Sequence, residues 1–291
     1  MRIFPKWQSL CASSIGSAHK KNDIPLQDYG VGATYPLPAM IIADGAGSAA
    51  NSATGAESAV KTSLEFIGRN KLKIDSQEKC EKLLDVVVTQ LKQKAQKLGA
   101  EVPSLATTLI IVYVLDKTIY WIQIGDGMIV ARKNGVLGCV SFPRHGEFAN
   151  ETVFVTSKKA SDSIQYGTFP VSSCDGIITF TDGLNPFLIH KNEMVPAQVC
   201  SSLIEQLKEK SMGVDDLENL LNNQLSDASD DDKTLGILVP CSRKKVIRMK
   251  LLSIKRVLRM RIQDVFLLCL KKANAVLERI IARMEVRGAT R

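Results

Sequence analysis

The sequence predicts an α+β fold in which packed β-sheets are covered by helices. Helical and strand-like patterns occur in separate runs along the 291 residues, without regular β-α-β alternation. No internal repeat with a period of about 20–50 residues is present. Hydrophobic residues make up 45% of the chain but aromatic residues only 5%, so aliphatic side chains must fill most of the core. These observations favour one large layered domain.

The first hundred residues predict short strands followed by two helices. Residues 10–32 can hold one or two short strands, and an apolar run begins at Met40 after two prolines. Apolar side chains at helical spacing predict one helix over residues 49–69 and a second over residues 76–98.

The following segment predicts a meander of antiparallel strands. Residues 104–142 are rich in β-branched and aromatic side chains and are cut by three turn-forming pairs: Asp116-Lys117, Asp126-Gly127 and Asn134-Gly135. Further strands are expected at residues 152–156, 176–183 and 233–239, and further helices over residues 196–210 and 214–225.

Positive charge is concentrated at the C-terminal end. Residues 241–291 carry a net charge of +12, whereas the preceding residues carry −4. Apolar residues recur there every three or four positions, with Lys and Arg between them, which predicts a basic amphipathic helical extension. We therefore divide the chain into a domain at 1–240 and an extension at 241–291. We expect the extension to bind a protein partner or a second copy; an anionic membrane surface, the acidic body and nucleic acid are the alternatives, in that order.

The cysteines and the hydropathy pattern indicate a cytoplasmic protein. Seven cysteines form no C-x-x-C pair, which argues for buried free thiols rather than a disulfide framework or a zinc ribbon. There is no continuous apolar N-terminal segment and no charge-free run of about 18 residues, so we expect neither a signal peptide nor a transmembrane helix. Peripheral membrane contact through the extension is the alternative.

Five aspartates stand beside strand-like segments. Asp44 and Asp182 each close an apolar run and precede a glycine, Asp126 separates two apolar runs, and Asp28 and Asp231 precede strand-like segments. Each has a structural explanation when taken alone, because Asp-Gly pairs form hairpin turns and acidic runs form solvated loops. Acids gathered at one place need a cation, however, because like charges repel. Carboxylate ligands suit Mg²⁺ or Mn²⁺.

The glycines after Asp44 allow a competing interpretation. Residues 45–50 match G-x-G-x-x-A, the dinucleotide-binding fingerprint. That site needs a second parallel strand ending in an acid about 20 residues further on. Glu65 is at that distance but lies inside a helical pattern, so the sequence favours the metal interpretation.

Six segments, in order, resemble the motifs of the metal-dependent type-2C protein serine/threonine phosphatases, in their compact bacterial form. The segments are QD (27–28), IIADGAG (41–47), ATTLIIVYV (106–114), IGDG (124–127), FTDGL (180–184) and DDKT (231–234). The resemblance implies an α-β-β-α sandwich, two antiparallel sheets flanked by helix pairs, with a two-metal centre at one end. It also implies hydrolysis of phosphoserine and phosphothreonine in proteins by a metal-activated water, without a covalent intermediate. The implied partner is a phosphoprotein, either a kinase or the target of one.

The resemblance also implies ligands for two Mn²⁺ or Mg²⁺ ions. Asp44 would bridge both ions, the Gly45 carbonyl would bind one of them, and Asp182 and Asp231 would bind the other. Asp28 would hold metal-bound waters.

Asp126 would join Asp182 at a third, weaker metal site. Asp232, where the family often has asparagine, would orient its neighbours.

Three departures from the family pattern concern the charge around the second metal, proton donation and phosphate binding. Gln27 stands where the family usually has glutamate, and Ala46 stands where many members have a histidine that acts as proton donor. The arginine that often grips phosphate is also missing. His19 is our candidate for proton donor or phosphate contact. We count it, with Asp44 and Asp182, among the expected catalytic residues. The alternative is that His19 is an exposed loop histidine. These departures motivate a second hypothesis, a catalytically weak or inactive binding module with the same fold, regulated or targeted through the basic extension.

Overall fold

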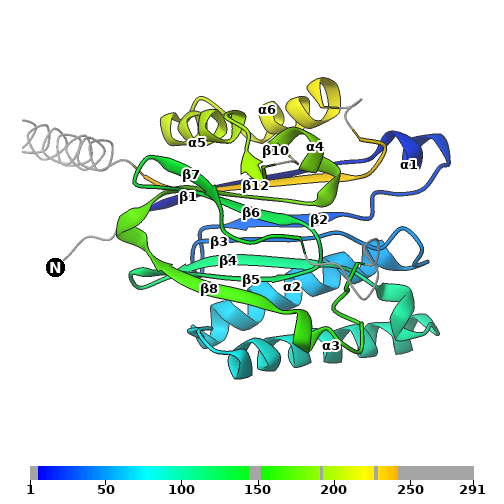
Figure 1. Ribbon diagram of the computed structural model, residues 1–291. Coiled ribbons are helices and arrows are strands. Elements are labelled where there is room, and N and C mark those ends of the chain that lie inside the picture. Colours follow the sequence, from blue (N-terminus) through cyan, green and yellow to red (C-terminus); the bar gives the residue numbers. More distant parts are fainter. Residues whose placement is uncertain (1–5, 144–151, 191–192, 226–228, 242–291) are drawn as a thin grey trace, which may run out of the picture. The chain divides into compact units, whose positions relative to one another are not determined.

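The computed structural model describes residues 6–143, 152–190, 193–225 and 229–241, whose strands form two five-stranded antiparallel sheets (Figure 1). The first sheet has the order β1 (Trp7–Ser14), β12 (Lys233–Pro240), β9 (Cys174–Phe180), β6 (Met128–Lys133) and β7 (Val136–Cys139). The second has the order β2 (Tyr29–Ala33), β3 (Ala39–Ala43), β4 (Leu109–Leu115), β5 (Thr118–Ile124) and β8 (Gln165–Pro170).

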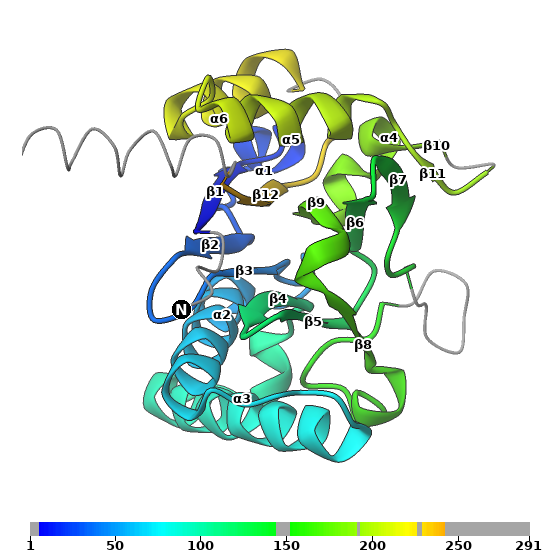
Figure 2. The same ribbon diagram turned by 90° about the vertical axis from the view of Figure 1, so that its left-hand side faces the viewer.

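Helices cover the outer face of each sheet (Figures 1 and 2). The second sheet is covered by α2 (Ser52–Asn70) and α3 (Gln77–Leu98), and the first by α5 (Val199–Glu209) and α6 (Val214–Asn219). Shorter elements are α1 (Ser17–Lys21), α4 (Asn185–Leu188), the hairpin β10 (Ile189–His190) with β11 (Val195–Pro196), and the turns η1 (Val102–Leu105), η2 (Ser161–Ser163), η3 (Val171–Ser173), η4 (Asp182–Leu184) and η5 (Leu220–Gln224).

Three apolar layers hold these four layers of secondary structure together. Because side chains alternate along a strand, Ile41 of β3 packs towards α2 and α3, whereas Ile42 packs between the sheets. In β9, Ile177 packs between the sheets and Ile178 packs towards α5 and α6. The predicted α-β-β-α sandwich of two antiparallel sheets is therefore confirmed.

Helix α2 packs unusually close to the chain that precedes β4. A Cβ at Gly55 would lie only 2.3 Å from the carbonyl oxygen of Leu105, so only glycine allows this contact. The contact fixes the start of β4 relative to α2, and the residues that follow Leu105 support one end of the sandwich.

The main helices and strands lie where the sequence predicts them, with three differences. The candidate strand at 152–156 does not form; Val153 and Val155 are buried from a loop, so their apolar character reflects packing and not strand structure. The strand β8 and the short helix α1 were not predicted. In β8 only Phe169 is buried, so the strand lacks the alternation that would reveal it.

The predicted extension at 241–291 lies, beyond Cys241, outside the described residues. Within the described part, five cysteines are free thiols, as predicted: Cys11, Cys80, Cys139, Cys174 and Cys200. No helix in the described part combines the length and the apolar character needed to cross a membrane.

Candidate metal centre

Asp44 is held at the end of β3 by hydrogen bonds between its backbone and two threonines. Its N–H donates to Thr108 Oγ1 at 2.9 Å, and its carbonyl oxygen accepts bonds of 2.8 Å from the Thr108 N–H and the Thr107 hydroxyl. Both threonines directly precede β4. Their hydroxyl groups therefore continue the hydrogen bonding between β3 and β4 beyond the ends of the two strands. The direction of the half-buried Asp44 side chain is thereby fixed.

The turn after Asp44 requires a glycine. A Cβ at Gly45 would lie 2.7 Å from the Gln27 carbonyl oxygen and 2.9 Å from the Cβ of Ser52, closer than packed atoms approach. Because Gly45 has no side chain, the backbone at Gln27 can lie alongside Asp44. Metal binding by the Gly45 carbonyl stays a prediction.

Asp28 is buried beside this turn and is tied to the other sheet. The Thr181 hydroxyl donates to Asp28 Oδ2 at 2.8 Å, and the Thr234 N–H donates to Thr181 Oγ1 at 2.9 Å. Thr181 follows β9 and Thr234 lies in β12. The other carboxylate oxygen of Asp28, Oδ1, is buried without a hydrogen-bond partner.

Gln123 clamps the turn between β5 and β6 that carries Asp126. Its side chain is fully buried, and Nε2 donates to the carbonyl oxygens of Gly127 at 2.7 Å and Gly125 at 3.3 Å. The Ser141 hydroxyl donates to Gln123 Oε1 and so fixes the orientation of the amide. Both residues beside Asp126 are thus held by one side chain.

Three carboxylates converge at this end of the sandwich. Asp44, Asp126 and Asp182 each offer an oxygen, and these three atoms lie within 4.8 Å of one another. Oδ1 of Asp126 and Oδ1 of Asp182 are buried without hydrogen-bond partners, although Thr152 donates to Asp126 Oδ2 at 2.6 Å. Unpaired buried oxygens of this kind fit a hard divalent cation, whose ligands are oxygen atoms.

Burial and mutual repulsion raise the pKa values of Asp28, Asp44 and Asp182. Burial raises the pKa of Asp28 to about 8, and burial together with the charges of Asp126 and Asp231 raises that of Asp182 to about 6. Burial, followed by the charges of neighbouring carboxylates, those of Asp28 and Asp182 first, raises the pKa of Asp44 well above its ordinary value. Without a cation, protons must therefore neutralise part of the cluster; a divalent cation can replace them.

Asp231 lies near this group but is not part of it. Its side chain is exposed, and its Oδ1 accepts the Asp232 N–H at 2.8 Å. Its charge nevertheless contributes to the raised pKa of both Asp44 and Asp182. Its predicted role as a ligand stays a prediction.

Asp232 joins the segment that carries His19 to the segment at Gln27. This carboxylate is 2% exposed and accepts two backbone N–H bonds of 2.7 Å, from Gly16 at Oδ1 and from Gln27 at Oδ2. His19 Nδ1 lies 2.9 Å from Asp232 Oδ1. His19 belongs to the short helix α1 and its side chain is only 13% exposed, so the interpretation as an exposed loop histidine is wrong.

Sequence analysis missed three buried polar residues around the acids: Gln123, Thr181 and Lys233. Gln123 stands between two isoleucines, and a single polar residue among buried apolar neighbours was a signal that could have revealed it. Thr181 and Lys233 stand beside aspartates and carry no such signal.

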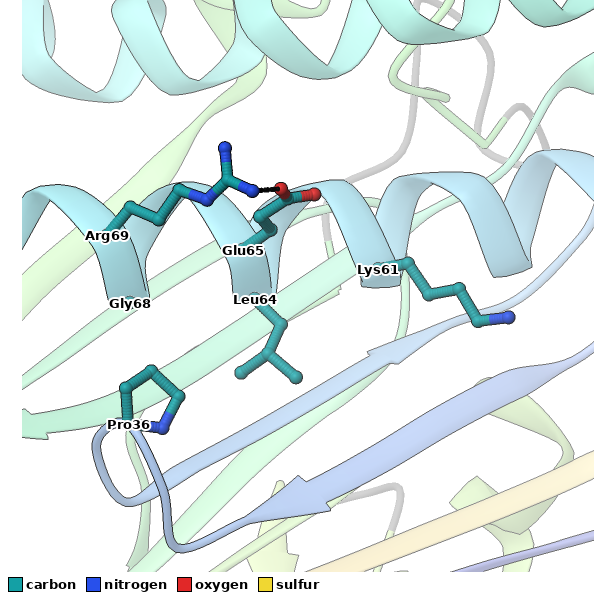
Figure 3. A pocket seen from close by; sticks show the side chains of 6 residues that line it. All are labelled: Pro36, Lys61, Leu64, Glu65, Gly68 and Arg69. Carbon is teal, nitrogen blue, oxygen red and sulfur yellow. Dashed lines mark ion pairs between the residues drawn. The ribbon is translucent and has the colours of Figure 1, made fainter.

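A separate hollow lies at the opposite end of β3 from the acids (Figure 3). It has a volume of about 330 Å³ and is lined by Pro36, Lys61, Leu64, Glu65, Gly68 and Arg69. Pro36 precedes β3 whereas Asp44 follows it, and Glu65 and Arg69 form an ion pair across one turn of α2. The hollow is therefore remote from the acid cluster.

Comparisons with known proteins agree with this geometry. The model of a family described as protein phosphatase 2C matches residues 15–227. Serine/threonine-protein phosphatase 3 of Escherichia coli (strain K12) is 28% identical over 256 residues, which cover 79% of this chain and 97% of that protein.

Solved structures show the same fold. The catalytic domain of the serine threonine protein phosphatase PstP, in complex with two manganese ions, is 12% identical with a TM-score of 0.58, over 81% of this chain and 99% of that one. Phosphatase Stp1 of Staphylococcus aureus is 15% identical with a TM-score of 0.56, over 83% and 98%. The family match covers more than half of the chain and includes Asp28, Asp44, Asp126 and Asp182. The chain therefore belongs to the protein phosphatase 2C family.

Proposed function

We propose that this chain hydrolyses phosphoserine and phosphothreonine in proteins, with two Mn²⁺ or Mg²⁺ ions at the end of the sandwich. The observation that carries the proposal is the convergence of the Asp44, Asp126 and Asp182 oxygens within 4.8 Å. Two findings on relatives support it: the E. coli relative is named a serine/threonine-protein phosphatase, and the PstP domain holds two manganese ions.

In this proposal each acid has a separate task. Asp44 would bind both ions, the Gly45 carbonyl would bind one of them, and Asp182 and Asp231 would bind the other. Asp28 would orient waters around the ions.

Asp126 and Asp182 would hold a third ion more weakly. When bound, the ions would neutralise phosphoryl oxygens and lower the pKa of the attacking water, so that no covalent intermediate is needed.

His19 is the proposed proton donor to the leaving group. Ala46 occupies the place of the family histidine and is buried with Ala106 against Phe154, so that turn offers no ionisable group. Asp232 Oδ1 lies 2.9 Å from Nδ1 of His19, which leaves Nε2 as the nitrogen available to a substrate.

The proposed partner is a phosphoprotein, either a kinase or a target of one. Such a substrate follows from the family and from the E. coli relative. The basic extension at 241–291 is proposed to be a separate docking segment for a protein partner, because all strands of the two sheets lie before it, the last being β12, which ends at Pro240.

The first prediction concerns the proposed ligands. Asp44→Asn and Asp182→Asn should each lower Mn²⁺-dependent hydrolysis of a phosphopeptide by at least about a hundredfold, since even changes outside the ligand shell cost about 10–100-fold. Asp215→Asn, at an exposed acid on α6, is the matched control and should keep full activity. Equal activity in the two ligand variants and the wild type would refute the site. A wild type that binds metal without turnover would favour the inactive binding module.

The second prediction concerns the stability of the metal-free protein. The native pKa values of Asp28 and Asp182 are about 8 and about 6, above the value near 3.8 in an unfolded chain. The unfolded state therefore ionises first as pH rises, and stability should fall between pH 4 and pH 8. We expect the melting temperature to drop by more than about 4 °C from pH 5 to pH 8.

Saturating Mg²⁺ should reverse this loss at pH 8, because the ion replaces the protons and binds only the folded state. Scanning calorimetry with and without Mg²⁺ measures both effects. A metal-free protein that becomes more stable towards pH 8, or that gains nothing from Mg²⁺, would contradict the prediction.

The third prediction concerns the extension. A chain ending at Pro240 should keep the phosphopeptide activity of the full chain, because β12 is complete at that residue. Neither form should sediment with anionic vesicles if the extension serves a protein partner. Loss of activity on truncation would contradict the division at 240, and sedimentation of the full chain alone would favour the membrane surface.

A further inference from the structure

We propose that Lys233 is a positioning residue that holds Asp231 beside the metal centre. This inference rests on the proposed function, because it concerns a proposed metal ligand. Asp231 is the most exposed of these ligands and lies outside the group of three converging carboxylates, so something must keep its carboxylate close to them.

Lys233 ties the backbone around Asp231 into a closed turn. Its ammonium donates to the carbonyl oxygen of Asp231 at 3.0 Å and to that of Ser229 at 2.8 Å. These carbonyls lie two and four residues before the lysine. The side chain thus folds back over its own chain and fixes the direction of the backbone from which the Asp231 carboxylate projects.

The stem of Lys233 joins this turn to the segment that carries Asp182. A Cβ at Gly183 would lie 3.4 Å from Lys233 Cγ and 2.1 Å from the Asp232 carbonyl oxygen. The start of β12 therefore packs directly against the turn after β9. Lys233 contacts both the Asp231 segment and the Asp182 segment, and its side chain is only 1% exposed.

Burying an ammonium group is costly unless the charge is compensated, so this lysine needs a reason to be there. The neighbouring charges of Asp230, Asp231 and Asp232 compensate it. The same positive charge must also repel a divalent cation bound nearby. The electrostatic effect of Lys233 on metal affinity is thus unfavourable, whereas its effect through the position of Asp231 is favourable.

These two effects have opposite signs, which allows a sharp test with Lys20 as a matched control. Lys20 is an exposed lysine on α1 whose side chain makes no hydrogen bond to the Asp231 turn within the described residues, yet it is close enough to Lys233 to act electrostatically. Burial lowers the pKa of Lys233, and the charge of Lys20 lowers it further. Lys20→Met removes only a nearby charge. Lys233→Met removes a charge and also the two hydrogen bonds to the carbonyl oxygens of Ser229 and Asp231.

The experiment is calorimetric titration of Mn²⁺ into the metal-free full chain, for wild type, Lys233→Met and Lys20→Met. We expect Lys233→Met to raise the Kd of the weaker of the two ions by about tenfold or more, as for other residues that orient ligands. Lys20→Met should leave the Kd unchanged or lower it. Lys233→Arg, which keeps donors and charge, should recover most of the affinity.

An unchanged or lower Kd in Lys233→Met would overturn the inference, because only the electrostatic effect would then remain. A wild type that binds no Mn²⁺ would instead overturn the proposed function, and this inference with it. Thermal melting checks that each variant is folded. If Lys233→Met does not fold, Lys233→Leu, which also lacks both the donors and the charge, decides the question by the same criterion.

Discussion

Repulsion among carboxylates at one end of the sandwich is the interaction that the surrounding structure must overcome. Two unit charges about 4 Å apart repel by about 4 kcal/mol at the effective dielectric constant near a protein surface. A domain is stable by only about 5–15 kcal/mol in total. The Asp44, Asp126 and Asp182 oxygens come within 4.8 Å, so their negative charges repel one another unless a cation compensates them. Burial, and after it the charges of neighbouring carboxylates, raise the pKa values of Asp28 and Asp182.

The sandwich can keep these acids together because they come from different layers. Asp44 follows a strand of the second sheet, Asp182 follows a strand of the first, and Asp126 lies on the turn where the chain passes from one sheet to the other. Their separation is therefore set by the apolar layer between the sheets, where Ile42 and Ile177 pack. Close packing of this kind resists the small movement that would relieve the repulsion.

Hydroxyl groups, glycines and one lysine refine the positions that the sheets provide. Thr108 holds the backbone of Asp44, and Thr181 holds the carboxylate of Asp28. Gly45 and Gly183 let neighbouring segments approach where a Cβ would collide. In the proposal above, Lys233 does for Asp231 what the threonines do for the other acids, and it does so against the unfavourable effect of its own charge.

The sequence predicted the fold and the acids, but not the residues that hold the acids in place. Asp44, Asp126 and Asp182 could be found because each follows or separates apolar strands, and strand ends meet at one edge of a sheet. The interpretation of 152–156 as a strand was wrong because buried valines look alike in a strand and in a packed loop. The short helix that carries His19 was not predicted, because five-residue helices have almost no periodic signal. Gln123 acts through contacts with a turn and a distant serine that no local pattern encodes.

The central claim is that divalent cations bind among Asp44, Asp126 and Asp182. Anomalous diffraction from crystals grown with Mn²⁺ tests it most directly, because it locates the ions independently of activity. We predict two strong anomalous peaks, both within coordination distance of Asp44 oxygens and one also of Asp182. An active enzyme whose crystals show no anomalous density among these residues would contradict the account.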